Sequence, residues 1–507
     1  MSMPAEQLNS APTLAELLRG FADAPAIPVT GISSDSRLLA EGDLFLACQG
    51  IASHGVDYLD EALAAGVVAV AFDGSTADLP ASIGVPVIAV DDLAGKLGEI
   101  ANRFYDYPSR KLKVIGITGT NGKTTVAWLV AQCQMLLGES CGYVGTLGYG
   151  VRELAGTEGM TTPAAVELHG RLAAFAEQQA TCAAIEVSSH ALSQRRVDGV
   201  RFEAALFTNL TRDHLDYHAD MRQYFDSKAS LFLDADVRSR IVNIDSDWGS
   251  ELASRCGADA VIVSTQPDRV ADRTEAHRHH LFIRSVAATE RGSDFAFTSS
   301  WGDGDVSLPL PGEFNVENAA LVLTLLLEQG VDLKTACAAL SQVSAPPGRM
   351  QRASSQGVAT YVDYAHTPGA LRSALEALRA HCEGNLWCVF GCGGERDAGK
   401  RPLMASAAEE VADHVVVTSD NPRNESPDSI IDAIVGGLRH PERATIIEDR
   451  AAAIAWAIGH AATDDVVLIA GKGHETYQQF GNKARPFSDL LVARAALGCS
   501  DVEASDD

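Results

Sequence analysis

A glycine-rich loop carries the residues best suited to chemistry. Residues 116–125 read Gly-Ile-Thr-Gly-Thr-Asn-Gly-Lys-Thr-Thr; an apolar run precedes them and an amphipathic run over 126–138 follows them. A strand, a glycine loop and a helix in this order allow backbone N–H groups and the helix N-terminus to bind phosphate oxygens. We expect Lys123 to reach the β- and γ-phosphates of a nucleotide and the Thr124 hydroxyl to bind Mg²⁺.

The spacing of this loop departs from the strict phosphate-loop pattern, because Ile117 stands where that pattern has glycine. The alternative is an ordinary strand-to-helix turn. The Lys-Thr-Thr run directly after Gly122 argues against that alternative. The loop alone predicts a nucleotide-binding protein and nothing more specific.

The elements that position this loop alternate between strand-like and helix-like runs, which predicts an α/β fold with mostly parallel sheets. The 507 residues are enough for about two to four domains, and a Pro-Pro-Gly run at 346–348 marks a break. We predict three domains, over residues 1–93, 94–345 and 346–507. Strands are expected over residues 42–48, 67–72, 87–90, 112–117, 183–187, 204–208, 241–244, 360–364, 386–390, 414–418 and 466–470. Helices are expected over residues 58–65, 93–105, 126–138 and 316–329.

Composition excludes several classes of protein. The formal net charge of −27 repels nucleic acid and anionic membranes, so any phosphate-bearing ligand must be held by local donors. No apolar run approaches the ~18 residues that a membrane span needs, and residues 1–20 lack the basic start and apolar stretch of a secretory signal. We expect a cytoplasmic monomer without nucleic-acid partners or membrane insertion. The ten cysteines form no CxxC pair, so we expect buried reduced thiols rather than a zinc site.

The glycine loop resembles that of the Mur ligases and of the related folylpolyglutamate synthetases. Segments along nearly the whole chain agree with this family in the same order, over residues 118–125, 186–190, 208–216, 315–320, 347–350 and 361–368. The resemblance implies an N-terminal UDP-binding α/β domain, a central P-loop ATPase with a mostly parallel sheet, and a C-terminal Rossmann-like domain that binds an amino acid. It also implies a role in bacterial cell-wall precursor synthesis.

The chemistry implied by the resemblance is carboxylate activation, in which ATP phosphorylates a substrate carboxylate and an amine displaces the phosphate to form an amide. Phosphoryl transfer between anions needs positive charge on the transferred oxygens. By resemblance, the catalytic residues are Lys123, Glu186, His214 and Lys228. The implied Mg²⁺ ligands are Thr124, Glu186, His214 and Lys228, the last carbamylated by CO₂. The implied ATP-binding residues are Gly119, Thr120, Asn121, Gly122, Lys123, Thr124, Thr125, Asn318, Arg349 and Asp363.

Taken singly, these residues have ordinary structural interpretations. Glu186 alone is a capping or salt-bridged carboxylate, His214 a polar-loop histidine, and Lys228 a solvated helix lysine. The joint pattern favours the functional interpretation for each of the three.

The N-terminal residues 34–37 and 42–45 are similar to the family members that add the third amino acid. In those members the acceptor is UDP-N-acetylmuramoyl-L-alanyl-D-glutamate. Taken alone, residues 161–163 could form a plain turn, and Arg196 could form a surface salt bridge. The residues that the resemblance assigns to this substrate are Ser34, Ser36, Ile51, Ala52, Ser53, Thr161, Thr162, Ser188, Gln194 and Arg196.

Three expected strands of the last domain run directly into polar loops, over 391–401, 419–424 and 471–477, and parallel strands place such loops at one edge of a sheet. Two guanidiniums beside two carboxylates suit a zwitterion with more than one carboxylate and ammonium, such as meso-2,6-diaminopimelate. The run 420–423 also resembles the signature of diaminopimelate-adding members. The residues predicted to bind this amino acid are Arg396, Asp420, Asn421, Pro422, Arg423, Gly471 and Glu475.

Three other functions stay open. A lysine-adding ligase should lack the pair Asn421 and Arg423, and a folylpolyglutamate synthetase should lack the segment 34–37. A nucleotide-gated binding protein should bind ATP without forming an amide.

Overall fold

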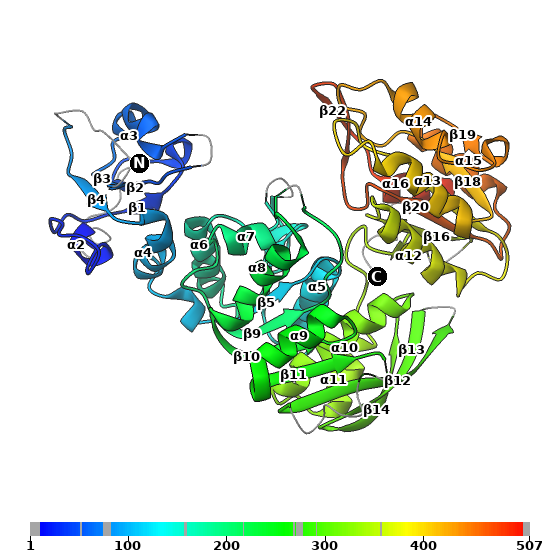
Figure 1. The fold of residues 1–507 in the computed structure, drawn as a ribbon, viewed down its shortest axis with the longest axis horizontal. Helices are drawn as coiled ribbons and strands as arrows, with labels where there is room; N and C mark the ends of the chain where they lie inside the picture. The colour runs from blue at the N-terminus through cyan, green and yellow to red at the C-terminus, as the bar shows by residue number, and fades with distance from the viewer. Residues whose placement is uncertain are drawn as a thin grey trace. The chain divides into compact units, whose positions relative to one another are not determined.

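The computed structural model describes residues 11–50, 53–74, 83–156, 160–215, 217–266, 269, 277–289, 292–354 and 357–499 (Figure 1). The chain divides into two compact units. The first unit comprises Met1–Ile262 and Arg273–His279, and the second comprises Val263–Asp272 and His280–Asp507.

The first sheet of the first unit is parallel, in the order β1 (Gly31–Ser33), β2 (Asp43–Ala47), β3 (Ala69–Asp73) and β4 (Val87–Val90). Its strands are apolar at successive positions because both faces are covered. Leu44 and Leu46 pack in one cluster, with α2 (Leu14–Leu17) and α4 (Leu97–Phe104). Phe45 and Ala47 pack in another, with α3 (Leu59–Ala65). The alternation of a strand therefore fills two cores at once.

A second sheet in the first unit carries the glycine loop, with neighbouring strands in the order β10-β9-β5-β8-β6-β7. All neighbours in this run are parallel except β6 and β7. Its strands are β5 (Lys113–Thr118), β6 (Cys141–Gly145), β7 (Gly148–Gly150), β8 (Cys182–Glu186), β9 (Arg201–Phe207) and β10 (Asp236–Asn243). The accompanying helices are α5 (Lys123–Leu136), α6 (Ala165–Glu177), α7 (Ser189–Ser193), α8 (Met221–Leu233) and α9 (Asp247–Cys256). Because β8 and β9 flank β5, the segments that follow these three strands meet at one edge.

The boundary between the units falls within β11 (Ala260–Ser264), at Val263. The second unit contains, apart from His279, the antiparallel run of β12 (His279–Thr289), β13 (Gly292–Ser299) and β14 (Gly302–Leu308). Helices α10 (Glu313–Glu328) and α11 (Leu333–Leu340) follow. Twelve of the sixteen residues of α10 are buried, which explains why its sequence is apolar on nearly every side.

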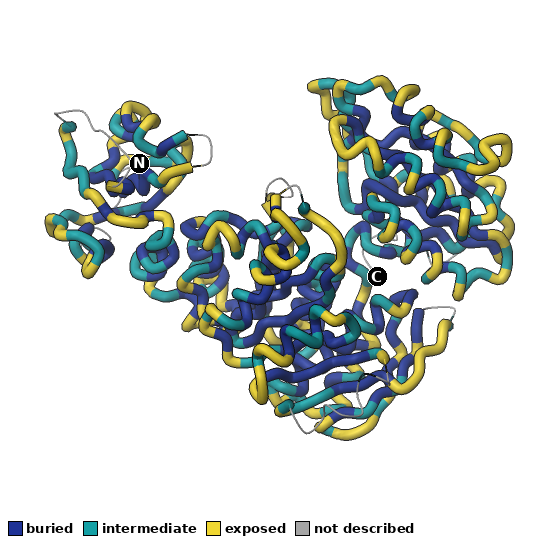
Figure 2. The backbone as a smooth tube through the Cα atoms, viewed as in Figure 1, coloured by how far each residue is buried: buried dark blue, intermediate teal, exposed yellow. Residues whose placement is uncertain are grey.

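The last sheet has the order β15-β16-β20-β17-β18-β19 and is parallel except between β15 and β16. Buried clusters cover both of its faces, and its central strands are drawn mostly dark blue, the colour of buried residues (Figure 2). The strands are β15 (Gln351–Arg352), β16 (Ala359–Asp363), β17 (Leu386–Phe390), β18 (His414–Val417), β19 (Thr445–Ile446) and β20 (Val466–Ala470), with the hairpin β21 (Tyr477–Phe480) and β22 (Lys483–Pro486). The helices are α12 (Pro368–Arg379), α13 (Lys400–Val411), α14 (Pro427–Val435), α15 (Arg450–His460) and α16 (Asp489–Ala496).

The α/β fold with mostly parallel sheets is confirmed, and the expected strands and helices match the observed ones to within a few residues. The antiparallel run β12–β14 and the short strands β6 and β7 were not expected from the sequence. The domain boundaries at 93 and 345 stay predictions. All ten cysteines are free, and Cys133, Cys141, Cys182, Cys388 and Cys392 are buried.

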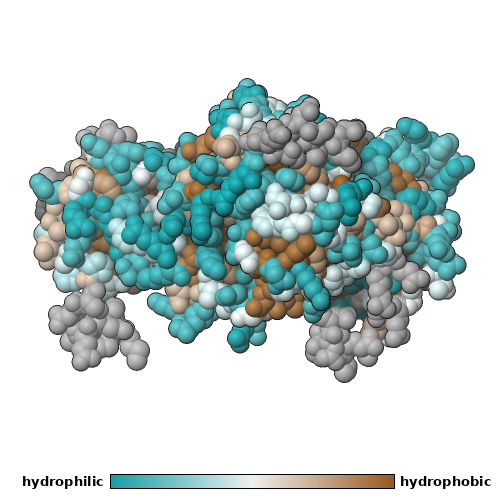
Figure 3. Space-filling view, turned by 90° about the horizontal axis from the view of Figure 1, so that it is seen from below, coloured by the Kyte–Doolittle hydropathy of each residue, from teal (hydrophilic) through white to brown (hydrophobic). Residues whose placement is uncertain are grey.

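No helix in the described part of the chain is long and apolar enough to cross a membrane. Hydrophilic side chains predominate on the face drawn in Figure 3, with apolar patches between them.

Close packing between β6 and α6 gives a test of the second sheet. A Cβ on Gly142 would lie 2.3 Å from Cδ2 of Phe175, a buried ring. We therefore expect Gly142→Ala to lower the free energy of unfolding by about 1–3 kcal/mol, as overpacking of a core usually does. Thermal unfolding measures the effect. Gly84→Ala is the matched control, since a Cβ there meets no atom within 4 Å; equal melting temperatures for the two variants would contradict this packing.

Candidate nucleotide and amino-acid sites

The glycine loop is shaped by glycines that approach other backbone closely. Gly119 has φ 147°, and a Cβ there would lie 1.9 Å from Oγ1 of Thr208, the residue after β9. Gly122 adopts the left-handed conformation and caps the N-terminus of α5. Asn121 N donates to Oδ1 of Asn209 at 3.0 Å, which ties the loop to the same segment after β9. Only glycine fits such positions without strain.

Lys123 folds back over this loop. Its Nζ donates to the carbonyl oxygens of Gly119 at 3.0 Å and Thr120 at 2.9 Å. The ammonium therefore lies beside the backbone that can bind phosphate, at the N-terminus of α5.

A buried carboxylate lies beside the loop. Glu186 ends β8 with 1% of its surface exposed, and burial of a charge is costly unless donors compensate it. Oε2 accepts from the hydroxyls of Thr124 at 2.9 Å and Thr146 at 3.2 Å. Oε1 accepts from the Tyr143 hydroxyl at 2.5 Å and from Thr146 N at 2.9 Å. The carboxylate is thus held rigidly against the first turn of α5.

Lys228 reaches the loop from α8 and has 1% of its surface exposed. Its Nζ donates to the Gly119 carbonyl at 2.8 Å and lies 4.7 Å from the ring centroid of Tyr224. Burial holds the pKa of Lys228 well below its ordinary 10.5, the nearby Lys123 charge lowers it further, and Asp213 opposes both. The sequence suggested a solvated helix lysine when the residue is taken alone; the structure instead makes it a buried amine beside the loop.

His214 lies near the loop through Tyr224, whose ring is 6.1 Å from its own and whose hydroxyl lies 3.1 Å from Oγ1 of Thr120. Its side chain is 45% exposed, Nε2 lies 3.5 Å from Oδ2 of Asp213, and its ring packs 5.0 Å from that of His190. Among the described residues no hydrogen bond joins it to Glu186 or Thr124. Of the four residues implied to bind Mg²⁺, Thr124 and Glu186 are hydrogen-bonded to each other, Lys228 contacts the loop at Gly119, and His214 lies against Tyr224.

The five residues of 161–196 assigned to the acceptor substrate form one cluster next to Glu186. Thr162 Oγ1 donates to the Glu186 carbonyl at 2.7 Å and accepts from Ser188 N at 3.0 Å. Arg196 donates to the Thr162 carbonyl at 2.8 Å and to Oε1 of Gln194 at 2.6 Å. Thr161 joins through Thr146, with the two hydroxyls 3.4 Å apart.

The N-terminal residues of the acceptor set lie where β1 and β2 end. Ser34 and Ser36 follow β1, and Ser53 lies in the segment that follows β2. Strands β1 and β2 are parallel neighbours. Ser36 Oγ donates to Oε2 of Glu61 at 2.9 Å. Ile51 and Ala52 lie outside the described residues.

Three residues of the ATP set belong to the second unit. Asn318 is buried in α10, and its Nδ2 lies 3.5 Å from Oδ1 of Asn315. The Arg349 guanidinium lies 4.3 Å from the ring centroid of Tyr364, and its Nη1 is buried without a hydrogen-bond partner. A buried donor of this kind suits an anionic ligand.

Asp363 ends β16 and caps the loop that contains Arg349. Its carboxylate accepts from Met350 N at 2.7 Å and from Ala365 N at 2.8 Å. Burial raises its pKa, and the Arg349 charge opposes that rise.

The loops after β17, β18 and β20 meet at one edge, as the sequence predicted. A Cβ on Gly393 would lie 3.0 Å from Nη1 of Arg423 and 3.7 Å from Cγ of Arg396, so both side chains lie against the same glycine. Arg423 Nη1 donates to the Gly394 carbonyl at 2.7 Å. Within the described residues neither arginine forms an ion pair.

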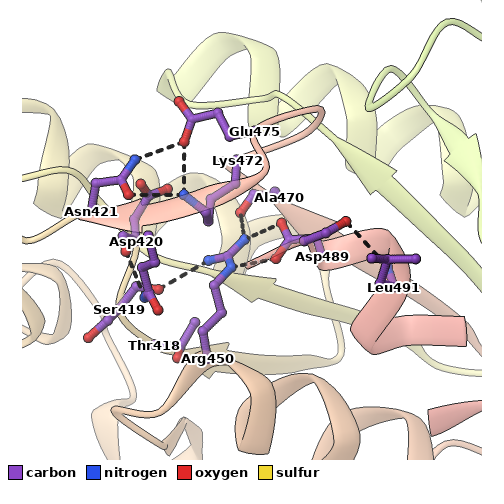
Figure 4. Close-up of polar contacts among 12 residues, drawn as sticks. Thr418, Ser419, Asp420, Asn421, Arg450, Ala470, Lys472, Glu475, Asp489 and Leu491 are labelled. Carbon is purple, nitrogen blue, oxygen red and sulfur yellow. Dashed lines mark hydrogen bonds and ion pairs between the residues drawn. The ribbon is translucent and has the colours of Figure 1, made fainter. Parts of the chain in front are cut away.

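Negative charge lies on the loop after β20 and, on the same loop as Arg423, after β18. Glu475 Oε2 accepts from Asn421 Nδ2 at 2.8 Å and from Lys472 Nζ at 2.8 Å (Figure 4). Asp420 lies beside Gly471, where a Cβ would be 2.7 Å from its Oδ2. Pro422 belongs to the same loop, and its carbonyl lies 2.0 Å from where Gly394 would carry a Cβ.

Several contacting residues were not predicted to act at these sites. Tyr143 and Thr146 lie on or after β6, a strand that the glycine-rich run 141–145 conceals. Tyr224, whose hydroxyl lies 3.1 Å from Oγ1 of Thr120, and the buried Lys472 were assigned no role from the sequence. Their types were visible in the sequence, but their partners lie many residues away.

The buried amine gives a test with a defined sign. Because folding lowers the pKa of Lys228, the unfolded chain binds more protons at a pH between the folded value and 10.5, so stability rises with pH in that window. Lys228→Met removes the buried charge and should raise the free energy of unfolding by about 0.5–2 kcal/mol near neutral pH. Denaturant unfolding in CO₂-free buffer with a chelator measures it.

The gain should shrink as the pH approaches 10.5. Lys113→Met, at the exposed start of β5, is the control and should leave stability within about 0.5 kcal/mol. A Lys228→Met variant that is less stable than wild type at neutral pH would mean that the folded state gains from this ammonium.

Three family models match the chain in succession. They are the Mur ligase family catalytic domain over residues 28–105, the Mur ligase middle domain over 117–326, and the Mur ligase glutamate ligase domain over 348–473. The curated relatives include "UDP-N-acetylmuramoyl-L-alanyl-D-glutamate--2,6-diaminopimelate ligase" of Coxiella burnetii, 42% identical over 92% of this chain and 96% of the relative. The protein of the same name from Pseudomonas aeruginosa is 44% identical over 93% of this chain and 95% of the relative.

Solved structures agree with these matches. One titled as a UDP-N-acetylmuramoyl-L-alanyl-D-glutamate--2,6-diaminopimelate ligase is 32% identical, with a TM-score of 0.71 over 96% of this chain and 99% of that one. MurF from Acinetobacter baumannii is 18% identical, with a TM-score of 0.64 over 91% of this chain and 95% of that one, and shares the fold. Three successive domain matches and relatives above 40% identity over nine-tenths of the chain lead to one conclusion: this chain belongs to the Mur ligase family.

Proposed function

We propose that this chain is the ATP-dependent ligase that joins meso-2,6-diaminopimelate to UDP-N-acetylmuramoyl-L-alanyl-D-glutamate in peptidoglycan precursor synthesis. The observation that carries the proposal is the edge of the last sheet, where Arg396 and Arg423 lie beside one glycine and Glu475 lies on a neighbouring loop. The names of the relatives at 42–44% identity support the same substrates. The expected compartment is the cytoplasm, and the expected state is a monomer.

The first unit activates the carboxylate. ATP phosphorylates the substrate carboxylate to an acyl phosphate, and the amine then displaces phosphate to form the amide. Lys123 and the N-terminus of α5 place positive charge where the transferred oxygens would lie. Arg349, with its buried unpaired donor, is proposed to bind the nucleotide together with Asn318 and Asp363, as the family resemblance implies.

The groups around Glu186 fit Mg²⁺. The Glu186 carboxylate and the Thr124 hydroxyl are hard oxygen donors 2.9 Å apart. No group of three or more His, Cys, Asp or Glu suited to a metal ion occurs within the described residues. The Glu186 carboxylate and the Thr124 hydroxyl are consistent with Mg²⁺, which usually takes one or two carboxylates and completes its shell with water and phosphate oxygens. When bound, the ion would neutralise charge that develops on the phosphates.

Lys228 is proposed to contribute a further oxygen ligand as a carbamate. Its neutral amine adds to the carbon of CO₂ and loses a proton, which gives –NH–COO⁻. Burial and the Lys123 charge favour the neutral, nucleophilic amine by lowering the pKa of Lys228. The modification would place a carboxylate beside Lys123 and relieve the repulsion between the two cations.

The second unit selects the amine. Diaminopimelate differs from lysine by one carboxylate, which a guanidinium can bind in a bidentate manner. Arg396 and Arg423 have no carboxylate partner among the described residues, so they are available to a ligand. Glu475 and Asp420 supply the negative charge for ammonium groups.

Two other activities predict different behaviour. A lysine-adding ligase would have no use for two unpaired arginines at this edge. A folylpolyglutamate synthetase shares the fold, as solved examples at 20% identity do, but would not need the N-terminal segment around Ser34 and Ser36.

The direct test is phosphate release from ATP with UDP-N-acetylmuramoyl-L-alanyl-D-glutamate and a panel of amines. We expect release with meso-diaminopimelate, and almost none with lysine or without an amine. Lys123→Ala should fold and lose turnover, because the transferred phosphoryl group loses its cation. Equal release without any amine would favour a nucleotide-gated binding protein, and preference for lysine would refute the proposal.

Arg423 is expected to read the extra carboxylate. Arg423→Ala should raise KM for diaminopimelate about 10- to 100-fold, since a lost hydrogen bond to a charged group costs roughly 1.5–3 kcal/mol. Arg423→Lys should behave similarly because lysine lacks the bidentate fork. The preference over lysine should shrink in both variants.

Steady-state kinetics with each amine measures this effect. Arg439→Ala, a 70% exposed side chain of the same unit, is the control and should change neither constant. If Arg423→Ala keeps both its KM and its rejection of lysine, Arg396 becomes the residue to test.

A further inference from the structure

An ion pair is fully buried beneath the amino-acid edge. Arg450 and Asp489 have side chains with 0% exposure, and they meet through two bonds, Nε to Oδ1 at 2.7 Å and Nη2 to Oδ2 at 2.8 Å (Figure 4). Both donors and both carboxylate oxygens are used. The pair is therefore rigid and has a defined direction.

The same guanidinium also binds the backbone of two loops. Nη2 donates to the Ala470 carbonyl at 2.9 Å, and Nη1 donates to the Ser419 carbonyl at 3.3 Å (Figure 4). Ala470 is the last residue of β20, and Ser419 is the second residue after β18. Gly471, which follows Ala470, is the first residue of one loop of the proposed amino-acid site, and Ser419 is itself the first residue of the other.

Local preference does not explain this placement. Arg450 is the first residue of α15, and a cation at a helix N-terminus is opposed by the helix dipole. Burial lowers the pKa of Arg450, and the carboxylates of Asp489, Asp420 and Glu475 outweigh that effect and raise it. Asp489 contributes most to holding the charge on Arg450, and Asp420 and Glu475 add to it.

Stability does not explain the pair well either. A buried ion pair can often be replaced by apolar side chains of similar volume without loss of stability. Apolar side chains could hold α15 against α16, whose first residue is Asp489, because the neighbouring core is apolar. They could not hydrogen-bond the two carbonyls.

A second set of hydrogen bonds connects the two loops to each other. Lys472, with 0% exposure, donates to Oδ1 of Asn421 at 3.0 Å and to Glu475 at 2.8 Å. Gln478 donates to the Asp420 carbonyl at 2.8 Å. The loops after β18 and β20 are thus joined to each other, and both are joined to the guanidinium below.

We propose that Arg450, oriented by Asp489, is a positioning residue for the incoming amino acid: it fixes the spacing between loops 419–424 and 471–477, and so the distance between Arg423 and Glu475. The inference rests on the proposed function, in that this edge binds the amine. Arg450 itself touches no substrate in this account.

The test uses a double variant, Arg450→Met with Asp489→Leu, which removes both charges and keeps volume, and the single variant Arg450→Lys, which keeps the charge but cannot form the fork. Asp465→Asn is the matched control. Asp465 accepts from Trp387 Nε1 at 2.9 Å and from Asn385 N at 2.7 Å. These contacts lie at the ends of β17 and β20 that face away from the proposed amino-acid site. Each full-length variant is measured for KM of all three substrates and for backbone hydrogen exchange.

We expect KM for the amino acid to rise about 10-fold or more in both Arg450 variants, because small misplacements of binding groups are costly. KM for ATP and for the UDP substrate should stay within about 2-fold. Amides of 419–424 and 471–477 should exchange faster while those of β17 do not. Asp465→Asn should change stability and leave the amino-acid KM unchanged.

An unchanged amino-acid KM and unchanged loop exchange in a folded variant would overturn the inference. So would a parallel change in all three KM values and in β17. If the double variant does not fold, Arg450→Lys decides. Should wild type use another amine, the proposed function fails, while exchange and the KM of that amine still decide the role of Arg450.

Discussion

Charge is buried at the carboxyl ends of parallel strands, and the surrounding structure must compensate it. Glu186 at the end of β8 takes four hydrogen bonds from three residues, two of them on or directly after β6. Each missing donor would remove one of the two hydrogen bonds that a buried carboxylate oxygen accepts, which is costly. The strand order around β5 follows from the same need, because β8 and β9 must lie beside β5 to bring carboxylate, amine and loop together.

The two units meet this requirement differently. In the first unit the polar and aromatic contacts described for the Lys228 amine are the Gly119 carbonyl and the Tyr224 ring, and burial lowers its pKa and disfavours its charge. In the second unit Arg450 is fully paired and stays charged. A poorly compensated cation suits chemistry, whereas a fully compensated one suits the placement of other groups.

The sequence was informative where one short segment determines the structure. Strands such as β17 and β20 are continuous apolar runs. The glycine loop needs glycine at Gly119 and Gly122 because both have positive φ. It was less informative where function depends on partners distant in the chain. The burial of Lys228 depends on Gly119, 109 residues away.

Other features were hidden for related reasons. Strand β6 contains two glycines, which conceals Tyr143, and β12 is largely exposed over 284–289, so that its pattern lacks a buried face. Lys472 lies in the expected polar loop 471–477, but its role depends on Asn421, 51 residues away. The residues assigned to the acceptor over 161–196 lie in one cluster, and the roles assigned from family motifs stay predictions.

The proposed choice of amino acid depends on charge complementarity at the edge of the last sheet. The most direct measurement is a crystal structure with ADP, UDP-N-acetylmuramoyl-L-alanyl-D-glutamate and meso-diaminopimelate bound. The account predicts one ligand carboxylate within hydrogen-bond distance of the Arg423 guanidinium and a ligand ammonium beside Glu475. A ligand whose carboxylates both avoid Arg423 and Arg396, or whose ammonium groups lie away from Glu475, would contradict it.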